Sequence, residues 1–286
     1  MHRSIIILNY DKPQVLQVAT QMEAFFSKRD IESFRIGVKD CSSCIDLRDV
    51  DLAVVLGGDG TVLSAARMVS PFGIPIFPVN LGTLGFITEV SPEDWPSDLE
   101  LCLSDGLGSF GRLMFQVQVL RGDTVILKES ALNEVAVSGG GISKLLRLGV
   151  TLKTSNLGTY KADGMIVATP TGSTAYSMAA GGPILQPDME AMILNPICPF
   201  TLSHRPIVLP GWEQVSIQVE AGQRTSIIAT VDGQIEMNLS EGDVVRVSAA
   251  PYKAQIFGSN KRSFYDVLRY KLNWSGGTDA GRTFGS

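Results

Sequence analysis

The chain has 286 residues with a formal net charge of −5, and 44% of the residues are hydrophobic. This length predicts about two domains, and this hydrophobic content excludes a disordered chain. Lysine and arginine are scattered rather than clustered, which argues against a nucleic-acid partner. No apolar run reaches the roughly 18 residues that span a bilayer, and the amino terminus lacks a signal-peptide cleavage site, so we expect a cytoplasmic protein without membrane contact.

Cysteine and histidine are too scarce for several kinds of site. Of the four cysteines, only Cys41 and Cys44 form a Cys-x-x-Cys pair, and no second pair or histidine cluster completes a zinc site. We interpret that pair as incidental residues of a loop. With only two histidines, a catalytic triad or a multi-histidine metal centre is also disfavoured.

The amino-terminal part alternates between strand-like and helix-like patterns. Apolar runs predict strands at residues 5–9, 31–37, 51–56 and 74–80. Apolar residues at helical spacing predict helices at residues 13–26 and from residue 61 onward. Such alternation is typical of an α/β domain with a doubly wound parallel sheet, which we place at residues 1–105.

The strand at residues 51–56 ends in Gly-Gly-Asp-Gly-Thr at residues 57–61. Ligands of open α/β sheets bind at the carboxyl ends of parallel strands. Gly58, Gly60 and Thr61 are therefore candidates to bring backbone N–H groups close to phosphate oxygens. Asp59 would repel a phosphate unless it accepts a proton from an attacking hydroxyl or holds a metal ion. The alternative is a tight turn in which Asp59 only caps the helix.

A second glycine-rich stretch, at residues 80–88, follows the next predicted strand. Carboxyl ends of neighbouring parallel strands meet at the same edge of a sheet. We therefore expect the two loops to form a cleft at that edge.

Beyond residue 105 the pattern changes to many short strands. They are predicted at residues 114–120, 124–129, 135–138, 146–152, 166–169, 206–209, 215–219, 226–231 and 244–249. Glycine or proline separates most of them, which predicts a β-rich, sandwich-like second domain at residues 106–262. A helical pattern at residues 263–274 is expected to return to the first domain, and residues 275–286 are expected to form a flexible tail.

The first polar interruption of these strands is the pair Asn133 and Glu134. An amide beside a carboxylate can recognise the edge of a base or the two hydroxyls of a ribose. Taken alone, the pair is better explained by a surface turn.

A second polar stretch follows the strand at residues 166–169, where hydroxyl-bearing and small residues lead into a predicted small-residue helix. Hydroxyls and free N–H groups at a helix start bind phosphate or ribose oxygens well, and small side chains let a flat ring approach the backbone. The alternative is an ordinary capped helix. The candidate ligand contacts are Thr171, Thr174, Ala175, Tyr176 and Ser177.

Two further motifs stand near predicted strands. Arg205 is a candidate partner for a phosphate or carboxylate because its guanidinium stays charged. His204 fits a partly buried structural residue as well as it fits a ligand contact. Asp232 and Gly233 predict a type I′ turn, and Asp232 and Gln234 join the candidate binding residues.

Together these motifs resemble those of the NAD kinase family, and of its bacterial members in particular. They stand in the family's order: residues 57–61, 80–86, 133–134, 163–177, 181–183, 205–206, 232–234 and 271–274. Gly-Gly-Asp-Gly alone is shared with lipid kinases and phosphofructokinases. The whole series implies transfer of a phosphoryl group to the 2′-hydroxyl of the adenosine ribose of NAD, which gives NADP.

The resemblance also implies an architecture and partners. These are an α/β domain, a β-rich domain, a cleft between them, and a homodimer or homotetramer. Mg²⁺ or another divalent metal is implied without assigned ligands. ATP is the expected phosphoryl donor, but the sequence does not decide between ATP, another triphosphate and polyphosphate, because no Walker-type loop marks a donor site.

Roles for individual residues come from the same resemblance. Asp59 is the implied general base. Phe86 lines the adenine pocket, and Asn133 and Glu134 hold ribose hydroxyls or the adenine edge. Thr174, Ala175 and Tyr176 wrap around the dinucleotide. Asp163 contacts its carboxamide end, from a neighbouring subunit, and Lys161 occupies a position linked to preference for NAD over NADH.

The chain departs from the family at Ala179, where a serine is common. Alanine has no hydroxyl, so a hydrogen bond toward the adenine, worth on the order of 1 kcal/mol, has no donor there.

Two other functions compete with this interpretation. A lipid kinase shares Gly-Gly-Asp-Gly, but the chain shows no amphipathic membrane-seeking helix. A nucleotide-binding regulator would keep the pocket without turnover.

Overall fold

The computed structural model describes residues 1–38, 46–104, 108–141, 145–201, 203–259 and 261–273. Cys41, Cys44 and the predicted tail lie outside these ranges. The chain forms two compact units: the α/β unit comprises Met1–Phe110 and Gln255–Ser286, and the sandwich unit comprises Gly111–Ala254. The domain boundaries expected near residues 105 and 262 stay predictions.

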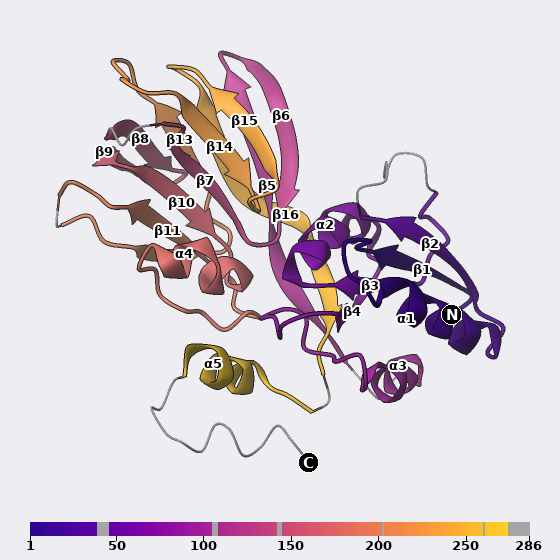
Figure 1. Ribbon diagram of the computed structural model, residues 1–286. Coiled ribbons are helices and arrows are strands. Elements are labelled where there is room, and N and C mark those ends of the chain that lie inside the picture. The colour runs from indigo at the N-terminus through magenta and orange to yellow at the C-terminus, as the bar shows by residue number, and fades with distance from the viewer. Residues whose placement is uncertain (39–45, 105–107, 142–144, 202, 260, 274–286) are drawn as a thin grey trace. The chain divides into compact units, whose positions relative to one another are not determined.

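In the α/β unit the parallel strands lie in the order β2-β1-β3-β4, and Ile256, near the end of β16, pairs with Ile76 of β4 (Figure 1). The strands are β1 (Arg3–Leu8), β2 (Glu32–Gly37), β3 (Leu52–Gly57) and β4 (Ile76–Asn80). The helices are α1 (Val15–Ser27), α2 (Asp59–Val69), α3 (Trp95–Leu103) and α5 (Phe264–Leu272), with a 3-10 turn η2 at Ser70–Phe72.

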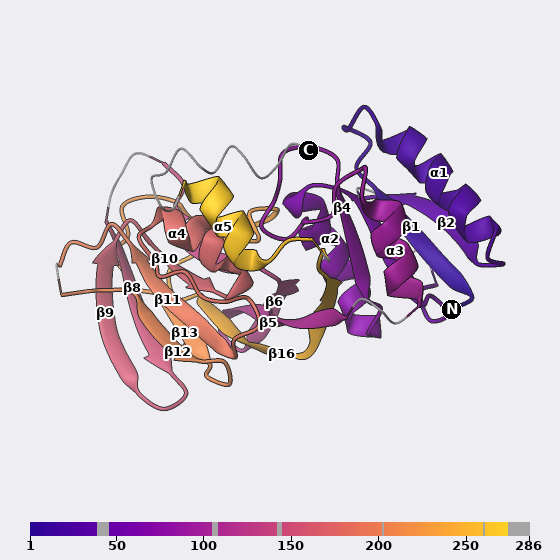
Figure 2. The same ribbon diagram turned by 90° about the horizontal axis from the view of Figure 1, so that it is seen from below.

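Helices cover both faces of this sheet. α1 and α3 share one face, where Phe25 meets Trp95 edge to face with ring centroids 5.6 Å apart (Figure 2). The chain moves from β1 to β2 in one direction and from β3 to β4 in the other, so right-handed crossovers place α1 and α2 on opposite faces. All of β3 is buried, as a strand covered on both faces must be. The predicted doubly wound sheet is confirmed.

The reversal of direction lies between β1 and β3. In doubly wound folds, ligands bind at the carboxyl ends of the strands where the order reverses. The loop at residues 57–61 follows β3 and therefore lies at this switch point.

The sandwich unit contains two sheets. In the first, β13 lies between β8 and β16, β9 pairs with β8, and β5 pairs with β16 and β6; the second has the order β12-β11-β10-β7-β14-β15. Strands β5 to β10 are Ser109–Arg121, Thr124–Ala131, Glu134–Gly139, Leu146–Leu152, Asn156–Ala162 and Gly164–Ala168. Strands β11 to β16 are Ala191–Ile197, Ile207–Pro210, Val215–Val219, Ile227–Val231, Ile235–Leu239 and Val244–Phe257.

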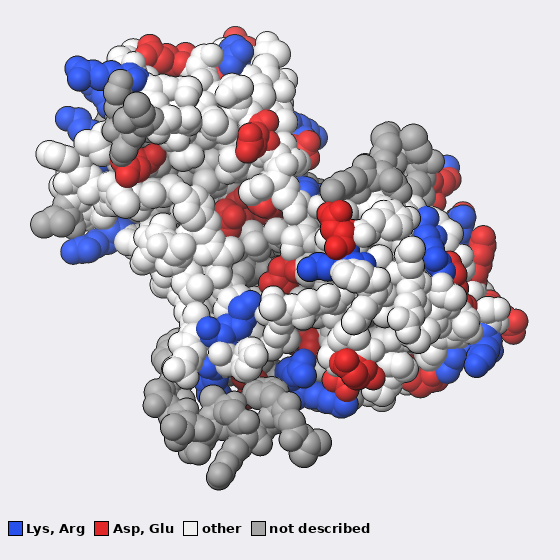
Figure 3. All heavy atoms as spheres, in the orientation of Figure 1, with Lys and Arg blue, Asp and Glu red and all other residues white. Residues whose placement is uncertain are grey.

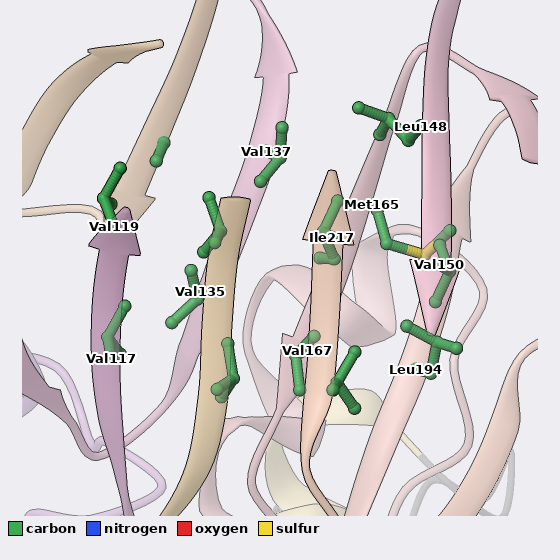
Figure 4. Close-up of a cluster of buried hydrophobic side chains, with 14 of the residues drawn as sticks. Val117, Val119, Val135, Val137, Leu148, Val150, Met165, Val167, Leu194 and Ile217 are labelled. Atoms are coloured by element: carbon green, nitrogen blue, oxygen red, sulfur yellow. The ribbon is translucent and has the colours of Figure 1, made fainter. Parts of the chain in front are cut away.

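One apolar cluster fills the space between these sheets. Val117 from β5 and Ile217 from β13 face Val135 from β7 and Val167 from β10 (Figure 4). These side chains recur at every second position along each strand, which is why alternating sequences predicted them. The predicted sandwich-like domain is confirmed.

Three strands were missed from the sequence. β9 is largely exposed, and its apolar residues do not alternate regularly. β15 (Ile-Glu-Met-Asn-Leu) does alternate apolar and polar residues, so its pattern was present in the sequence and was overlooked. β11 carries Asn195 and Pro196 within an apolar run, and both residues are depleted in strands. The small-residue helix predicted after residues 166–169 is also wrong in detail, because a 3-10 turn η3 (Thr171–Thr174) precedes α4 (Tyr176–Ala179), a helix of four residues.

Charged side chains of both signs are interspersed on the face that Figure 3 shows. Within the described ranges, no helix combines the length and apolar character that crossing a membrane requires.

Candidate active site

Asp59 occupies the first turn of α2, directly after β3. Its Oδ2 atom accepts a hydrogen bond from the Phe86 backbone N–H at 2.8 Å. Its Oδ1 atom accepts from the Ile87 N–H at 3.2 Å, the Thr88 N–H at 3.0 Å and the Thr88 hydroxyl at 2.9 Å. The helix cap is Gly58, so the alternative in which Asp59 caps its own helix is wrong. The loop after β4 wraps around the carboxylate instead.

Two glycines make this close approach possible. A Cβ atom at Gly85 would lie 1.9 Å from Asp59 Oδ1, and one at Gly57 would lie 2.1 Å from Thr61 Oγ1. Any larger residue at either position would displace the group that it meets. By contrast, no atom lies within 4 Å of a Cβ placed at Gly58, which leaves open space beside the start of α2.

Asn80, the last residue of β4, fixes the shape of the loop. Its Nδ2 donates to the Thr83 carbonyl at 2.7 Å and to the Thr88 carbonyl at 3.3 Å, and its Oδ1 accepts from the Gly82 N–H at 2.7 Å. Asn80 thus fixes the loop that holds the Asp59 carboxylate. The Asp59 residue itself is half-buried. A carboxylate with a fixed direction, on a residue that is not sealed from solvent, can accept a proton from a ligand hydroxyl.

In the sandwich unit, residues 132–134 are held by Asp232. The buried Asp232 carboxylate accepts hydrogen bonds from the backbone N–H groups of Leu132 at 3.1 Å, Asn133 at 2.8 Å and Glu134 at 3.2 Å. Asp232 and Gly233 have φ of 51° and 62°, and the Gln234 N–H donates to the Val231 carbonyl, as in the predicted type I′ turn. The turn therefore aims a carboxylate at the start of β7.

The loop at residues 169–177 packs against the other side of this segment. The Thr169 N–H donates to the Asn133 carbonyl at 2.8 Å, and the Thr169 hydroxyl donates to the Leu132 carbonyl at 2.5 Å. A Cβ at Gly172 would lie 2.1 Å from the Asn133 carbonyl oxygen, so only glycine fits there. The backbone of residues 132–134 is bonded on both sides, which leaves its side chains to meet a ligand.

Several of those side chains have buried atoms without a partner. Three buried oxygen atoms have no hydrogen-bond partner among the described residues: Asn133 Oδ1, Glu134 Oε2 and Thr171 Oγ1. An unpaired buried polar atom costs about 1–3 kcal/mol. Three such atoms in adjoining segments indicate a site whose hydrogen bonds are completed by a polar ligand.

Burial raises the pKa of Glu134 from its ordinary 4.5 to about 8. The neighbouring Asp232 carboxylate raises this pKa further, and a hydrogen bond from the Tyr176 backbone N–H opposes the rise. At neutral pH the side chain is therefore a carboxylic acid, which can donate one hydrogen bond as well as accept.

Comparison with known proteins decides the family. Residues 38–107 match the profile of the ATP-NAD kinase N-terminal domain, and residues 132–258 match that of the ATP-NAD kinase C-terminal domain. An NAD kinase of Treponema denticola is 42% identical over 277 residues, which cover 96% of this chain and 98% of that protein. The chain belongs to the NAD kinase family. It is an enzyme that phosphorylates NAD to NADP, as the motifs predicted.

Other NAD kinases and solved structures agree. An NAD kinase of a Geobacter species is 35% identical over 285 residues, covering 96% of this chain and 99% of that protein. An Archaeoglobus fulgidus NAD kinase in complex with ATP has a TM-score of 0.73 and 25% identity, covering 94% of this chain and 97% of that one. Yeast NADH kinase complexed with NADH shares the fold, with a TM-score of 0.85 at 23% identity, covering 96% of this chain and 89% of that one.

The structure does not bring every predicted binding residue of this NAD kinase together. Along β10, Ala168 pairs with Glu134 and Gly164 pairs with Ser138, so Asp163 lies at the opposite end of the strand from the Asn133 segment. Lys161, in β9, is exposed, as is Arg205 just before β12.

The remaining predicted residues lie in the loop at residues 169–177 or at the turn. Ser177 is buried and accepts from Asn195 Nδ2, whereas Tyr176 and Gln234 are exposed and Ala175 is half-buried. The Thr174 hydroxyl donates to the Thr171 carbonyl. His204 stacks on Tyr160 with ring centroids 4.2 Å apart.

Sequence reasoning missed the residues that do the positioning. Thr88 and Gly85 belong to a loop that was noticed, but nothing in the sequence pairs them with Asp59. Thr169 and Asn195 were also unassigned, although both are fully buried polar residues at the end of or within a strand. A polar residue inside an apolar strand is the signal that could have found Asn195.

Proposed function

We propose that Asp59 is the general base of this NAD kinase. As the 2′-hydroxyl oxygen of the adenosine ribose of NAD forms a bond to the γ-phosphorus of ATP, Asp59 accepts the hydroxyl proton. The bond from that phosphorus to the β–γ bridging oxygen breaks, and ADP leaves. The observation that carries this proposal is the carboxylate of a half-buried aspartate, fixed by hydrogen bonds from Phe86, Ile87 and Thr88 at the carboxyl end of a parallel strand.

The N-terminus of α2 supports a phosphate contact at the same loop. Gly58 and Gly60 carry no side chain to obstruct a ligand, and α2 is an 11-residue helix whose first N–H groups carry partial positive charge. We propose that Gly58, Gly60 and Thr61 bind phosphate oxygens through their backbone N–H groups. We also propose that Phe86 lies beside the adenine ring.

In the sandwich unit we propose that Asn133, Glu134 and Thr171 bind the dinucleotide. Support comes from their buried oxygen atoms, which lack partners in the described structure. Ribose hydroxyls and the adenine amino group are hydrogen-bond donors that suit these acceptors. The contacts of Lys161, Asp163, Thr174, Ala175, Tyr176, Ser177, Arg205, Asp232 and Gln234 with NAD stay predictions from the family resemblance.

A magnesium ion that arrives with the triphosphate would need few ligands from the protein. The described residues contain no group of three or more His, Cys, Asp or Glu side chains that could hold an ion by themselves. Mg²⁺ is commonly bound through substrate phosphates and waters with only one or two carboxylates. When bound, the ion offsets the negative charge of the transferring phosphoryl group. We assign it no protein ligand.

Asp59→Asn tests the general base with the least structural change. With NAD, ATP and Mg²⁺, we expect turnover to fall roughly 10²- to 10⁴-fold, because asparagine cannot accept the proton, while NAD affinity measured by calorimetry stays within about threefold. Asp123→Asn is the matched control, since that aspartate is exposed in the β5–β6 turn.

Unchanged turnover in Asp59→Asn would contradict the base assignment. Comparing ATP with other triphosphates and polyphosphate as donors, in the same assay, would establish the donor range. The homo-oligomeric assembly and the cytoplasmic location stay predictions.

A further inference from the structure

The carboxyl-terminal segment of the α/β unit contacts the loop that holds Asp59. Its helix α5 begins with a capping box, in which the Ser263 side chain and the Asp266 backbone, and the Asp266 side chain and the Ser263 backbone, are hydrogen-bonded. Val267 and Leu268 are buried, so one face of the helix is anchored by packing. An anchored helix can hold its remaining side chains in defined places.

Lys271, in the last turn of α5, reaches back to this loop. Its Nζ donates to the Leu84 carbonyl at 2.8 Å and lies 4.8 Å from the centroid of the Phe86 ring. One ammonium group therefore makes a hydrogen bond to the backbone and a cation–π contact two residues further along.

The other end of the loop is held by the approach to α5. Arg262 Nη1 donates to the Glu89 carbonyl at 3.0 Å, and the Ser259 N–H donates to the Glu89 carboxylate at 3.2 Å. Residues 84–89 are thus attached to the carboxyl-terminal segment at both ends.

Between these attachments lie the groups that contact Asp59. The Phe86 N–H donates to Asp59 Oδ2, and a Cβ at Gly85 would lie only 1.9 Å from Oδ1. The backbone at Gly85 thus lies against the carboxylate, and a shift of Leu84 or Phe86 would reach Asp59 through this contact and the Phe86 hydrogen bond.

We propose that Lys271 is a positioning residue for Asp59. It touches no reacting atom; it fixes Leu84 and Phe86, and the Phe86 N–H then fixes the direction of the Asp59 carboxylate. This inference rests on the proposed role of Asp59 as the base. Lys271 is exposed, so solvent screens its charge and the expected effect is modest.

The first test compares three variants in the complete chain. Lys271→Met removes the ammonium but keeps the stem, and we expect kcat to fall about three- to tenfold with KM for NAD changed less than about twofold. Lys271→Arg retains a cation and a donor, and it should restore kcat to within about twofold of the parent.

Arg269→Met is the control in the same helix. Arg269 pairs with Asp266 rather than with the loop, so its loss should leave kcat unchanged. Thermal unfolding of all three variants shows whether the fold is kept. A kcat that is the same in Lys271→Met and Arg269→Met would overturn the proposal.

The second test repeats Lys271→Met in an Asp59→Asn background. If Lys271 acts through Asp59, the second substitution should cause no further loss of residual turnover, since the base that it positions is already absent. The same three- to tenfold loss in both backgrounds would refute the positioning role. Full turnover in Asp59→Asn alone would instead refute the general base, so the two failures can be told apart.

Discussion

Asp59 and Asp232 make the same kind of contact in the two units of this chain, with opposite consequences. Each carboxylate accepts hydrogen bonds from three successive backbone N–H groups, at residues 86–88 for Asp59 and 132–134 for Asp232. Asp59 is half-buried, whereas Asp232 is only 5% exposed. In the α/β unit a loop positions a carboxylate for chemistry, and in the sandwich unit a carboxylate positions a loop for binding.

The two aspartates differ in which nearby groups remain available to a ligand. Around Asp232 the partnerless buried oxygens belong to neighbouring side chains, Asn133 and Glu134. Asp59 itself is only half-buried, so the aspartate residue keeps some exposure to solvent. The same motif of three N–H groups on one carboxylate therefore does not identify a catalytic aspartate unless the exposure of that aspartate is known.

Gly85→Ala should break the α/β half of this comparison with the larger effect. The new Cβ would overlap Asp59 Oδ1, so the carboxylate or the loop must move, and we expect kcat to fall about 100-fold or more. Steady-state kinetics would measure this. Gly108→Ala, where no atom lies within 4 Å of the Cβ position, is the control and should keep its kcat. A fully active Gly85→Ala would show that the direction of the Asp59 carboxylate does not matter.

Asp232→Asn should break the sandwich half through binding and stability rather than through kcat. Asn-Gly still favours a type I′ turn, but the amide nitrogen now faces backbone N–H groups, so we expect a loss of about 2 kcal/mol in the free energy of unfolding. KM for NAD should rise while kcat changes less. Urea unfolding and kinetics would test this, with Asp123→Asn as the exposed control. A large loss of kcat at saturating NAD would remove the distinction between the two aspartates.

Glu134 sharpens the comparison through pH. Its pKa in the folded state is about 8, against an ordinary 4.5, so between these values the unfolded chain has lost a proton that the folded chain keeps. Glu134 therefore contributes to the free energy of unfolding below pH 4.5, and this contribution is lost as pH rises to about 8. It amounts to at most about 1.4 kcal/mol for each pKa unit between the folded and unfolded states. Glu134→Gln should flatten this decline in urea unfolding measured from pH 5 to 9.

The Glu134→Gln variant also has a clear contrary outcome. If the decline in stability between pH 5 and 8 is the same in the parent and the variant, another group is responsible. The variant Asp232→Asn should show a decline centred at lower pH, because the neighbouring negative charge that raises the Glu134 pKa is gone.

Local patterns carried much of the fold. Apolar runs such as residues 52–57 predicted buried strands, and the Asp-Gly pair at residues 232–233 predicted a type I′ turn. Both predictions succeeded because they depend on residues that are adjacent in the chain. The order of the motifs was enough to indicate the NAD kinase family. Strand β9 was missed because an exposed strand has little apolar alternation to detect.

The sequence by itself therefore determined the family, the two kinds of unit and the identity of Asp59 as a candidate. Only the tertiary structure decided what each aspartate does. The partners of Asp59 lie 27 to 29 residues along the chain, and those of Asp232 lie 98 to 100 residues away. Hydrogen bonds and burial depend on which distant segments fold together, and neither leaves a periodic trace in the sequence.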